Sequence, residues 1–205
     1  MENSGKNILF QAAEAWMNLT KYRYIFTYGY KNTLHTITLV FAPSDFPHLA
    51  GFHYMKDISV NPRFSHKKLL QKILDGTVDT TPFLHAAQFE SSVAPRLHAL
   101  IRLKESLDND FNLFQYMRQF YPFFTNIKAD YLISSHIEDT DYIFIISSHD
   151  GSASVEYTCC SIFEKNKRDY EEGQRERILL KKERVHIPSN QKDILYDRLS
   201  LSSEK

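Results

Sequence analysis

A histidine in the segment FPHLAGF is the first side chain whose type and position could carry chemistry. His48 lies just past an expected strand end, where a rigid scaffold can present an imidazole that ionises near neutral pH. Such a group can take up or give up a proton, so His48 is a candidate base or acid. The structural alternative is a buried imidazole that hydrogen-bonds the backbone, with Gly51 permitting the turn.

A strand-like run near the C-terminus carries a stripe of basic side chains. Over residues 178 to 187, the two-residue period of a strand places Lys182, Arg184 and His186 on one face. Cations in this arrangement can bind a phosphate, and Lys182 is the first candidate. The alternative is a strand that leaves the core with its charges in water, and the pattern fits both.

Further polar residues stand near the other expected strands. Lys128 could reach a phosphate or only water, whereas Tyr131 has the opposite parity and is expected in the core. Ser161 lies at two-residue spacing from Cys159 and Phe163, which puts the three side chains on one face of the expected strand. Its hydroxyl could donate to a phosphate or form a hydrogen bond within the sheet. Tyr170 carries a second phenol, which could stack on a base, carry a proton or cap the edge of the sheet. The further substrate-binding candidates are Lys56, Arg175, Arg177 and Arg184.

Common cofactor and metal motifs are missing from the sequence. It contains no GxxxxGK[ST], GxGxxG, HExxH or GxSxG pattern, so we expect no nucleotide-loop, dinucleotide, zinc-protease or hydrolase-elbow chemistry. Nine histidines are present, but His48 and His53 have no cluster of Cys or carboxylate beside them to complete a ligand set. Cys159 and Cys160 have no neighbouring basic residue or helix start that would activate a thiol. We expect neither a metal nor a cofactor.

Composition limits the class of protein. The chain has 205 residues, of which 42% are hydrophobic and 14% aromatic, enough for a substantial core in one domain over residues 1 to 199 with a frayed tail at 200 to 205. Twenty-five basic and 25 acidic residues cancel, so any affinity for nucleic acid must come from a local patch. Adjacent cysteines, a start without a signal-peptide pattern and the lack of a long apolar run predict a cytoplasmic protein that is not in a membrane.

Periodicity predicts an α+β fold. Apolar spacings of three and four predict helices over residues 6 to 19 and from 65 to about 120, closed by Pro122. Aromatic and β-branched runs at 22 to 28 and 34 to 41 predict a hairpin. Aromatic runs within 120 to 124 resemble base-stacking platforms but are more often core.

The strand period returns in the second half of the chain. Asp150-Gly151 predicts a tight turn between two of these strands. The runs together predict a four-stranded antiparallel sheet. Its strands are expected at residues 128 to 135, 141 to 148, 153 to 163 and 177 to 187.

The order of several short motifs resembles a known family. FPHLAGF, followed by Lys56-Asp57-Ile58, is similar to an F-x-H-L-x-G-[LIF] pattern, and KADYLI, CSIF, DY and LLKKE follow in order from Lys128 to Glu183. Over about residues 20 to 197 the chain resembles the phage- and mobile-element-associated members of the barnase, EndoU, colicin and RelE-like nuclease superfamily, specifically the fourth phage group.

The resemblance implies an N-terminal helical part and a four-stranded antiparallel sheet whose face cleaves RNA without a metal. His48 and Lys182 would be central and would lie in one groove, and a toxin or host-conflict role would follow. RNA is the expected partner, with a protein inhibitor as a further candidate. The alternative is a non-catalytic module that binds RNA or protein on the same fold. The assisting residues would be Lys128, Ser161, Tyr170 and Arg184.

Overall fold

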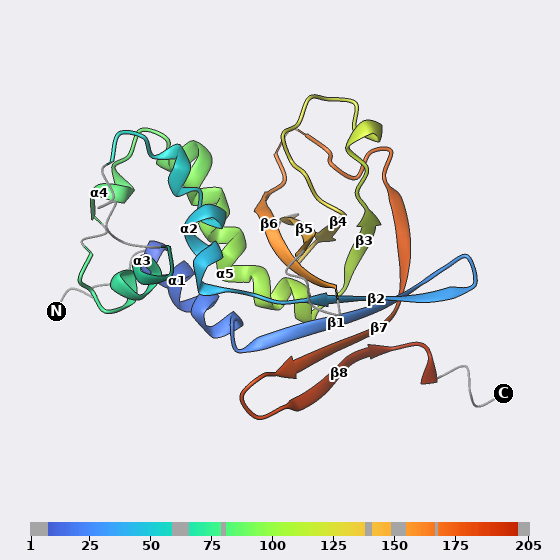
Figure 1. Cartoon of the computed structure of the whole chain (residues 1–205). Coiled ribbons are helices and arrows are strands. Elements are labelled where there is room, and N and C mark those ends of the chain that lie inside the picture. The colour runs from blue at the N-terminus through green and yellow to red at the C-terminus, as the bar shows by residue number, and fades with distance from the viewer. Residues whose placement is uncertain are drawn as a thin grey trace.

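The chain forms a layer of helices beside a β-barrel (Figure 1). The structure, a computed structural model, describes residues 8–58, 66–78, 81–137, 141–148, 155–166 and 168–200. The helices are α1 (Ile8–Leu19), α2 (Phe46–Leu49), α3 (His66–Leu74), α4 (Thr81–Leu84) and α5 (Ala94–Asp108), with short turns η1 (Pro43–Asp45), η2 (Phe52–Tyr54), η3 (Phe89–Val93) and η4 (Arg118–Phe120). The strands are β1 (Tyr22–Tyr30), β2 (Thr33–Leu39), β3 (Phe111–Gln115), β4 (Tyr131–Ser135), β5 (Asp141–Ser148), β6 (Glu156–Glu164), β7 (Arg175–His186) and β8 (Gln191–Asp197).

The strands close into a mixed barrel, so the predicted four-stranded antiparallel sheet is wrong. The order is β1-β2-β6-β5-β4-β3-β7-β8, and an additional pairing of β1 with β7 closes seven of the strands into a ring. The predicted hairpin joins the late strands at both edges: β2 runs parallel to β6, and β1 pairs antiparallel with β7 from Tyr22↔His186 to Gly29↔Ile178. These long-range pairings leave no trace in local periodicity, which is why the expected sheet was too small.

Two strands differ from the sequence prediction. The segment Phe111–Gln115, expected to be helical, is strand β3, because β4 and β7 supply ladder partners on its two sides. The helical stretch therefore ends at Asp108, well before Pro122. Strand β8 was not predicted; it returns along β7 after a turn in which Asn190 has a φ of 54°. The predicted Asp150-Gly151 turn lies outside the described residues.

The barrel interior continues into the helical layer. Rings from non-adjacent strands meet across it, as with Phe26 and Phe111, whose centroids are 5.3 Å apart. The hydroxyl oxygens of Tyr28 and Tyr131 lie 2.7 Å apart, so Tyr131 packs against this core as expected. The same cluster contains buried residues of α1 and α5, including Trp16, so the helices and the barrel share one core.

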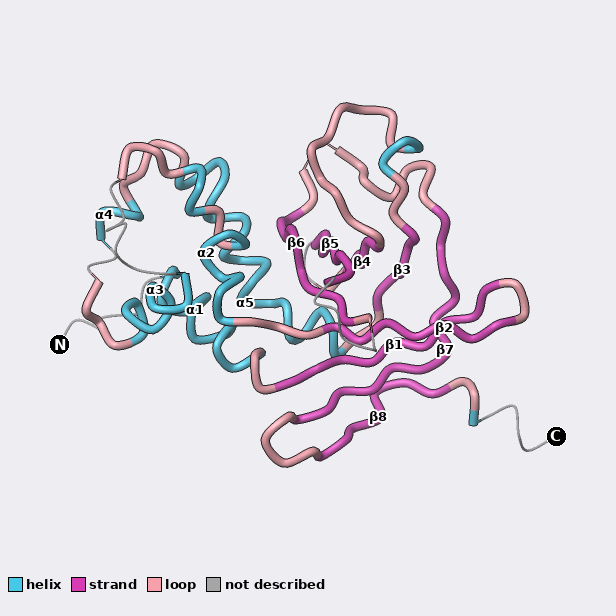
Figure 2. The backbone as a smooth tube through the Cα atoms, viewed as in Figure 1, coloured by secondary structure: helices cyan, strands magenta, loops and turns pink. Residues whose placement is uncertain are grey.

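A second, aromatic cluster lies on the opposite face of β4, β5 and β6. Phe144 and Phe163 stack there, and Tyr121 and Tyr170 pack over them from two long connections. These connections, β3 to β4 and β6 to β7, lie together at one end of the barrel (Figure 2). The side-chain amide of Gln174 joins them by hydrogen bonds to the backbone of Met117. No helix in the described ranges is both long and apolar enough to span a bilayer.

Candidate active site

Two adjoining cavities, of about 490 Å³ and 310 Å³, form one groove between the helical layer and the barrel. Five residues line both cavities, which makes them a continuous space: Tyr54, Arg96, Asn126, Ile127 and Ser161. The walls come from α2, η2, the start of α5, the outer face of β6, the connection before β4 and the connection between β6 and β7. We call this space the groove. Its size is in the range of small-molecule and substrate sites.

Two histidines stand side by side at one end of the groove. His48, on α2, is exposed, and its Nε2 lies 3.2 Å from the backbone oxygen of Cys160. A carbonyl can only accept, so Nε2 must carry the hydrogen and Nδ1 is left to exchange a proton. The ring of His53 stacks on that of His48, with centroids 5.1 Å apart and planes 20° apart. The groove therefore presents a pair of imidazoles.

Gly51 explains how the two rings meet. Its φ of +80° is in the left-handed region and makes the turn between α2 and η2. A Cβ at this position would lie 3.0 Å from Cδ of Arg96 and 3.2 Å from Cδ2 of Tyr54. The glycine of the FPHLAGF segment thus allows both the turn and the close approach of the groove wall. Burial, together with the charges of His48 and Arg96, lowers the pKa of His53, which favours a neutral imidazole near neutral pH.

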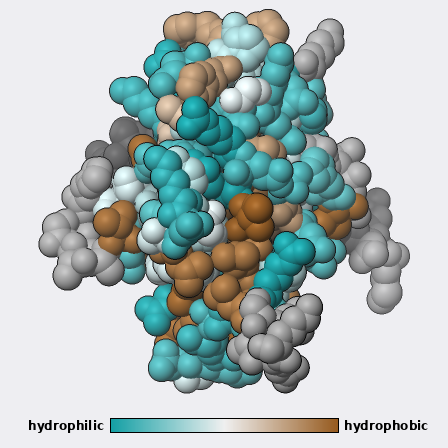
Figure 3. Space-filling view, turned by 90° about the vertical axis from the view of Figure 1, so that its right-hand side faces the viewer, coloured by the Kyte–Doolittle hydropathy of each residue, from teal (hydrophilic) through white to brown (hydrophobic). Residues whose placement is uncertain are grey.

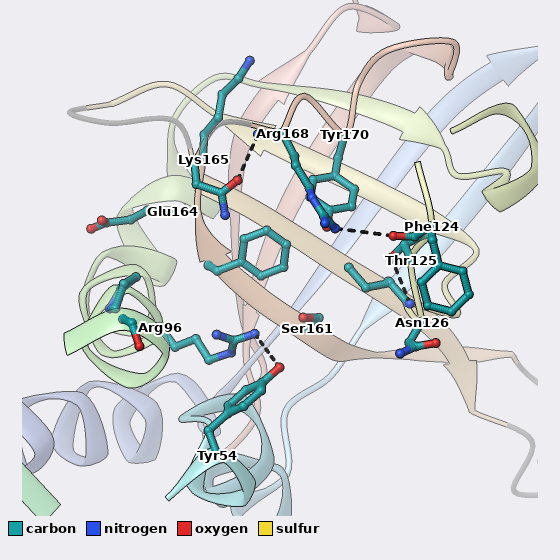
Figure 4. A pocket seen from close by; sticks show the side chains of 15 residues that line it. Tyr54, Arg96, Phe124, Thr125, Asn126, Ser161, Glu164, Lys165, Arg168 and Tyr170 are labelled. Atoms are coloured by element: carbon teal, nitrogen blue, oxygen red, sulfur yellow. Dashed lines mark hydrogen bonds between the residues drawn. The ribbon is translucent and has the colours of Figure 1, made fainter. Parts of the chain in front are cut away.

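Arg96 supplies a fixed cation beside the imidazoles. It donates hydrogen bonds to the backbone oxygen of Ser92 at 2.6 Å and to the hydroxyl of Tyr54 at 3.2 Å. Its guanidinium also lies 4.7 Å from the Tyr54 ring centroid. Figure 4 shows the side chain extending from α5 towards Ser161 on β6. No carboxylate pairs with Arg96 among the described residues, so its charge is available to an anion.

A bulge in β6 determines which side chains face the groove. The register with β5 changes from Phe144↔Ser161 to Ile145↔Cys159, which leaves Cys160 as the extra residue. As a result Cys160 and Ser161 both line the groove, while Cys159 is buried in the barrel core. The expectation that Ser161 shares a face with Cys159 is therefore wrong. Burial raises the pKa of the Cys160 thiol to about 12, so this thiol stays protonated.

The groove is basic although the chain has no net charge. Its walls carry four basic residues and one acidic residue, Glu164, whose carboxylate pairs with Arg102 at 2.8 Å. Lys128 is exposed and lines the groove, with no partner for its ammonium among the described residues. The four basic residues are Arg96, Lys128, Lys165 and Arg168. A local positive field of this kind attracts a polyanion.

Comparison with protein-family models matches residues 8–199 to the family described as phage-Barnase-EndoU-ColicinE5/D-RelE like nuclease4. The chain belongs to this nuclease family. The match confirms the resemblance inferred from the short motifs and extends it to almost the whole chain. Neither the curated proteins nor the solved structures that were compared gave a match.

Within this nuclease-family chain, Lys182 lies away from the groove, so the prediction that it shares one groove with His48 is wrong. Its side chain is 1% exposed, and its ammonium donates to the backbone oxygen of Asn109, just beyond the end of α5. Arg96 stands near the start of the same helix. Thirteen residues at 1.5 Å each put about 20 Å between these two positions along α5.

The basic stripe of β7 faces the C-terminal end of α5 instead of solvent or substrate. Arg184 pairs with Asp108, the last helical residue, at 2.5 Å and with Asp193 of β8 at 2.8 Å. Lys182 caps the backbone that follows, and its ammonium lies 4.7 Å from the Phe111 ring centroid. Cations at a helix C-terminus satisfy its carbonyls and its dipole. Lys182 and Arg184 therefore stabilise the end of α5, whereas His186 hydrogen-bonds to Ser189 in the turn before β8.

The remaining candidates divide between the groove and other surfaces. Tyr170 lines the groove but is 6% exposed and stacks on Tyr121, with ring centroids 4.6 Å apart. Arg175 and Arg177 lie outside it: Arg175 contacts the ring of Phe120, and Arg177 is buried and bonds to Gln115. Lys56 is exposed and does not line the groove.

Three groove residues went unassigned in the sequence. The spacing of the histidines suggested His53 only as a candidate metal ligand. Its position two residues after Gly51 is the feature that indicates a turn bringing its ring next to that of His48. Tyr54 and Arg96 carry no such signal, because Arg96 enters the groove only through the packing of α5 against η2. Within the described part of the chain, no three His, Cys, Asp or Glu side chains gather as a metal site would require.

Proposed function

We propose that the groove binds RNA and cleaves its backbone without a metal ion. The observation that supports this most directly is the pair of stacked imidazoles beside an unpaired arginine, within one basic groove of a nuclease-family chain. Metal-independent cleavage requires a base, an acid and cations or donors for the phosphorane oxygens. The side chains that line the groove include each of these groups.

The proton transfers follow from the two histidines. His53, whose lowered pKa favours the neutral form, takes the proton from the 2′-hydroxyl, and the 2′-oxygen attacks the phosphorus. The bond from phosphorus to the 5′-oxygen breaks, and His48 in its imidazolium form gives that oxygen a proton from Nδ1. The products are a 2′,3′-cyclic phosphate and a 5′-hydroxyl. The bond from Nε2 to the Cys160 carbonyl holds the His48 ring in place throughout.

Charge on the phosphorane would be stabilised by Arg96 and Lys128. Arg96 is held by Ser92 and Tyr54 before substrate arrives, so little reorganisation is needed when negative charge develops. Lys128 is an exposed cation in the same groove, and the hydroxyl of Ser161, towards which Arg96 extends, is a neutral donor. Lys182 and Arg184 have no part in this proposal, because the end of α5 already occupies them.

Single histidine variants test the proposal. His48→Ala and His53→Ala should each remain folded and lose on the order of 10² to 10⁴-fold in cleavage rate on single-stranded RNA. His98→Ala is the matched control, because His98 is exposed on α5 and does not line the groove. Product analysis should show cyclic phosphate ends.

Two outcomes would contradict the proposal. Full cleavage by folded His48→Ala would remove the imidazole pair from the mechanism. Tight RNA binding by the wild type, with no cleavage of any RNA tested, would favour the non-catalytic binding module instead. If cleavage is observed, a toxin or host-conflict role for a protein of this phage-related family becomes the next hypothesis to test.

A further inference from the structure

A short segment beside the groove exposes several aromatic rings. Among the described residues, the large aromatic side chains classed as exposed are Tyr54, Phe120, Phe123 and Phe124, so three of the four fall in one five-residue stretch. Phe124 is 76% exposed, the largest fraction of the four. In Figure 3 pale-brown apolar side chains lie at the top of the molecule, among hydrophilic ones, at the height of the β3–β4 connection in Figure 1. Exposed aromatic clusters of this kind mark interaction sites.

Phe124 is held in place although its ring is in solvent. Its backbone oxygen accepts a hydrogen bond from Arg168 at 3.4 Å, and the buried hydroxyl of Thr125 accepts one from the backbone of Ile127 at 3.2 Å. Beneath the segment, the Tyr121 ring is buried against Tyr170. The exposed ring is therefore presented by a fixed loop.

The surroundings of Phe124 suit a nucleotide. The ring lines the groove, as do Asn126 and Arg168, and Figure 4 shows Phe124 and Asn126 on the same wall, across from Tyr54. The Arg118 guanidinium lies 5.6 Å from the Phe124 ring centroid, which adds a cation where a phosphate would follow the base. The exposed Asn126 amide offers a donor and an acceptor, the groups that read a base edge.

We infer that Phe124 and Asn126 form a nucleobase-binding subsite of the groove and that the substrate is single-stranded RNA. Phe124 stacks on the face of an unpaired base, and Asn126 bonds to its edge, while the adjoining phosphate lies towards Arg96. In a duplex the base faces are covered by their neighbours, so a duplex cannot use the Phe124 ring. This inference rests on the proposed function, because it takes RNA as the ligand of the groove.

Binding measured in the His48→Ala background tests the subsite without cleavage. Phe124→Ala should weaken binding of a short single-stranded RNA roughly 5- to 150-fold, the range for loss of one stacked base. Phe124→Trp should keep the affinity, and Phe124→Leu should lose it, because leucine has no aromatic face. Phe123→Ala is the matched control: Phe123 is 56% exposed, contacts Tyr121 edge-on and does not line the groove.

The outcomes separate this inference from the proposed function. If the His48→Ala protein binds single-stranded RNA and Phe124→Ala binds it equally well, the subsite is overturned while the cleavage proposal stands. Equal affinity for a duplex of the same sequence also overturns the single-strand preference. If no RNA is bound by any variant and none is cleaved by the wild type, both are wrong. Quenching of a 2-aminopurine base by wild-type Phe124 but not by Phe124→Leu would support stacking directly.

Discussion

Replacing Lys182 with methionine should change how the stability of the protein depends on pH. The lysine is 1% exposed, and this burial lowers its pKa to about 8, with Asp110 and Asp108 opposing the shift. An unperturbed lysine has a pKa of about 10.4. The folded chain therefore binds fewer protons than the unfolded chain between about pH 8 and pH 10.4. In this interval the free energy of unfolding rises with pH.

The size of the effect follows from the two pKa values. Below about pH 8 both states carry the proton, and the full cost of burying the charge is present. Integrating the difference in bound protons from pH 7 to pH 10 raises the free energy of unfolding of the wild type by ~2.5 kcal/mol. Lys182→Met has no titrating group at this position and should not show this rise. At pH 7 the variant should differ little from the wild type. It avoids the buried charge but leaves the backbone oxygen of Asn109 without its donor, which costs about 1 to 3 kcal/mol.

Urea unfolding at four pH values from 7 to 10 measures this difference. Other titrating groups, such as Tyr24 and Tyr131, whose pKa values are raised by burial, act in both proteins and cancel when the variant is subtracted. The free energy of unfolding of the wild type minus that of Lys182→Met should rise steadily from pH 7 to pH 10. A difference that stays constant within about 0.5 kcal/mol would refute the reasoning, because it would mean that Lys182 is not buried as a titrating ammonium.

Two further predictions concern the groove. RNA cleavage should survive excess EDTA, since histidines and cations carry the proposed chemistry; loss of activity in EDTA and its rescue by magnesium would contradict that mechanism. Gly51→Ala should lower the melting temperature by several degrees, for a cost of about 1 to 2 kcal/mol, and should also slow cleavage, because its Cβ would press on Arg96 and Tyr54. Gly76→Ala is the control, with a φ of +72° and nothing within 4 Å of the added Cβ, so it should lose stability but keep its cleavage rate.

Local pattern was sufficient for most of the secondary structure. The hairpin of β1 and β2, the helices α1, α3 and α5, and the strands β4 to β7 all follow from periodicity. It failed at Phe111–Gln115, because apolar residues at 111, 113, 114 and 117 fit both the helical and the strand period in so short a run. Pairing with β4 and β7 decides that segment, and neither neighbour is local in sequence.

The site was harder to predict because it depends on a β-bulge and on contacts between elements that are distant in sequence. Parity along β7 correctly placed Lys182 and Arg184 on one face, but it could not show that the end of α5 covers that face. The bulge at Cys160 turns Ser161 away from the side of Cys159, and no residue type in the segment signals it. His48 could be predicted because it belongs to the FPHLAGF motif. Arg96 could not, because only the packing of α5 against η2 brings its side chain into the groove.

The distribution of ion pairs explains how a chain with zero net charge can hold a basic groove. Carboxylates neutralise the cations near the C-terminal end of α5 and along β7: Asp108 pairs with both Arg184 and Lys104, and Glu183 pairs with Lys181. No such pair involves Arg96 or Lys128 among the described residues. Asp169 likewise pairs with Lys165 at the groove wall, so the cations that keep their charge for a phosphate are Arg96 and Lys128, which line the groove beside the two histidines.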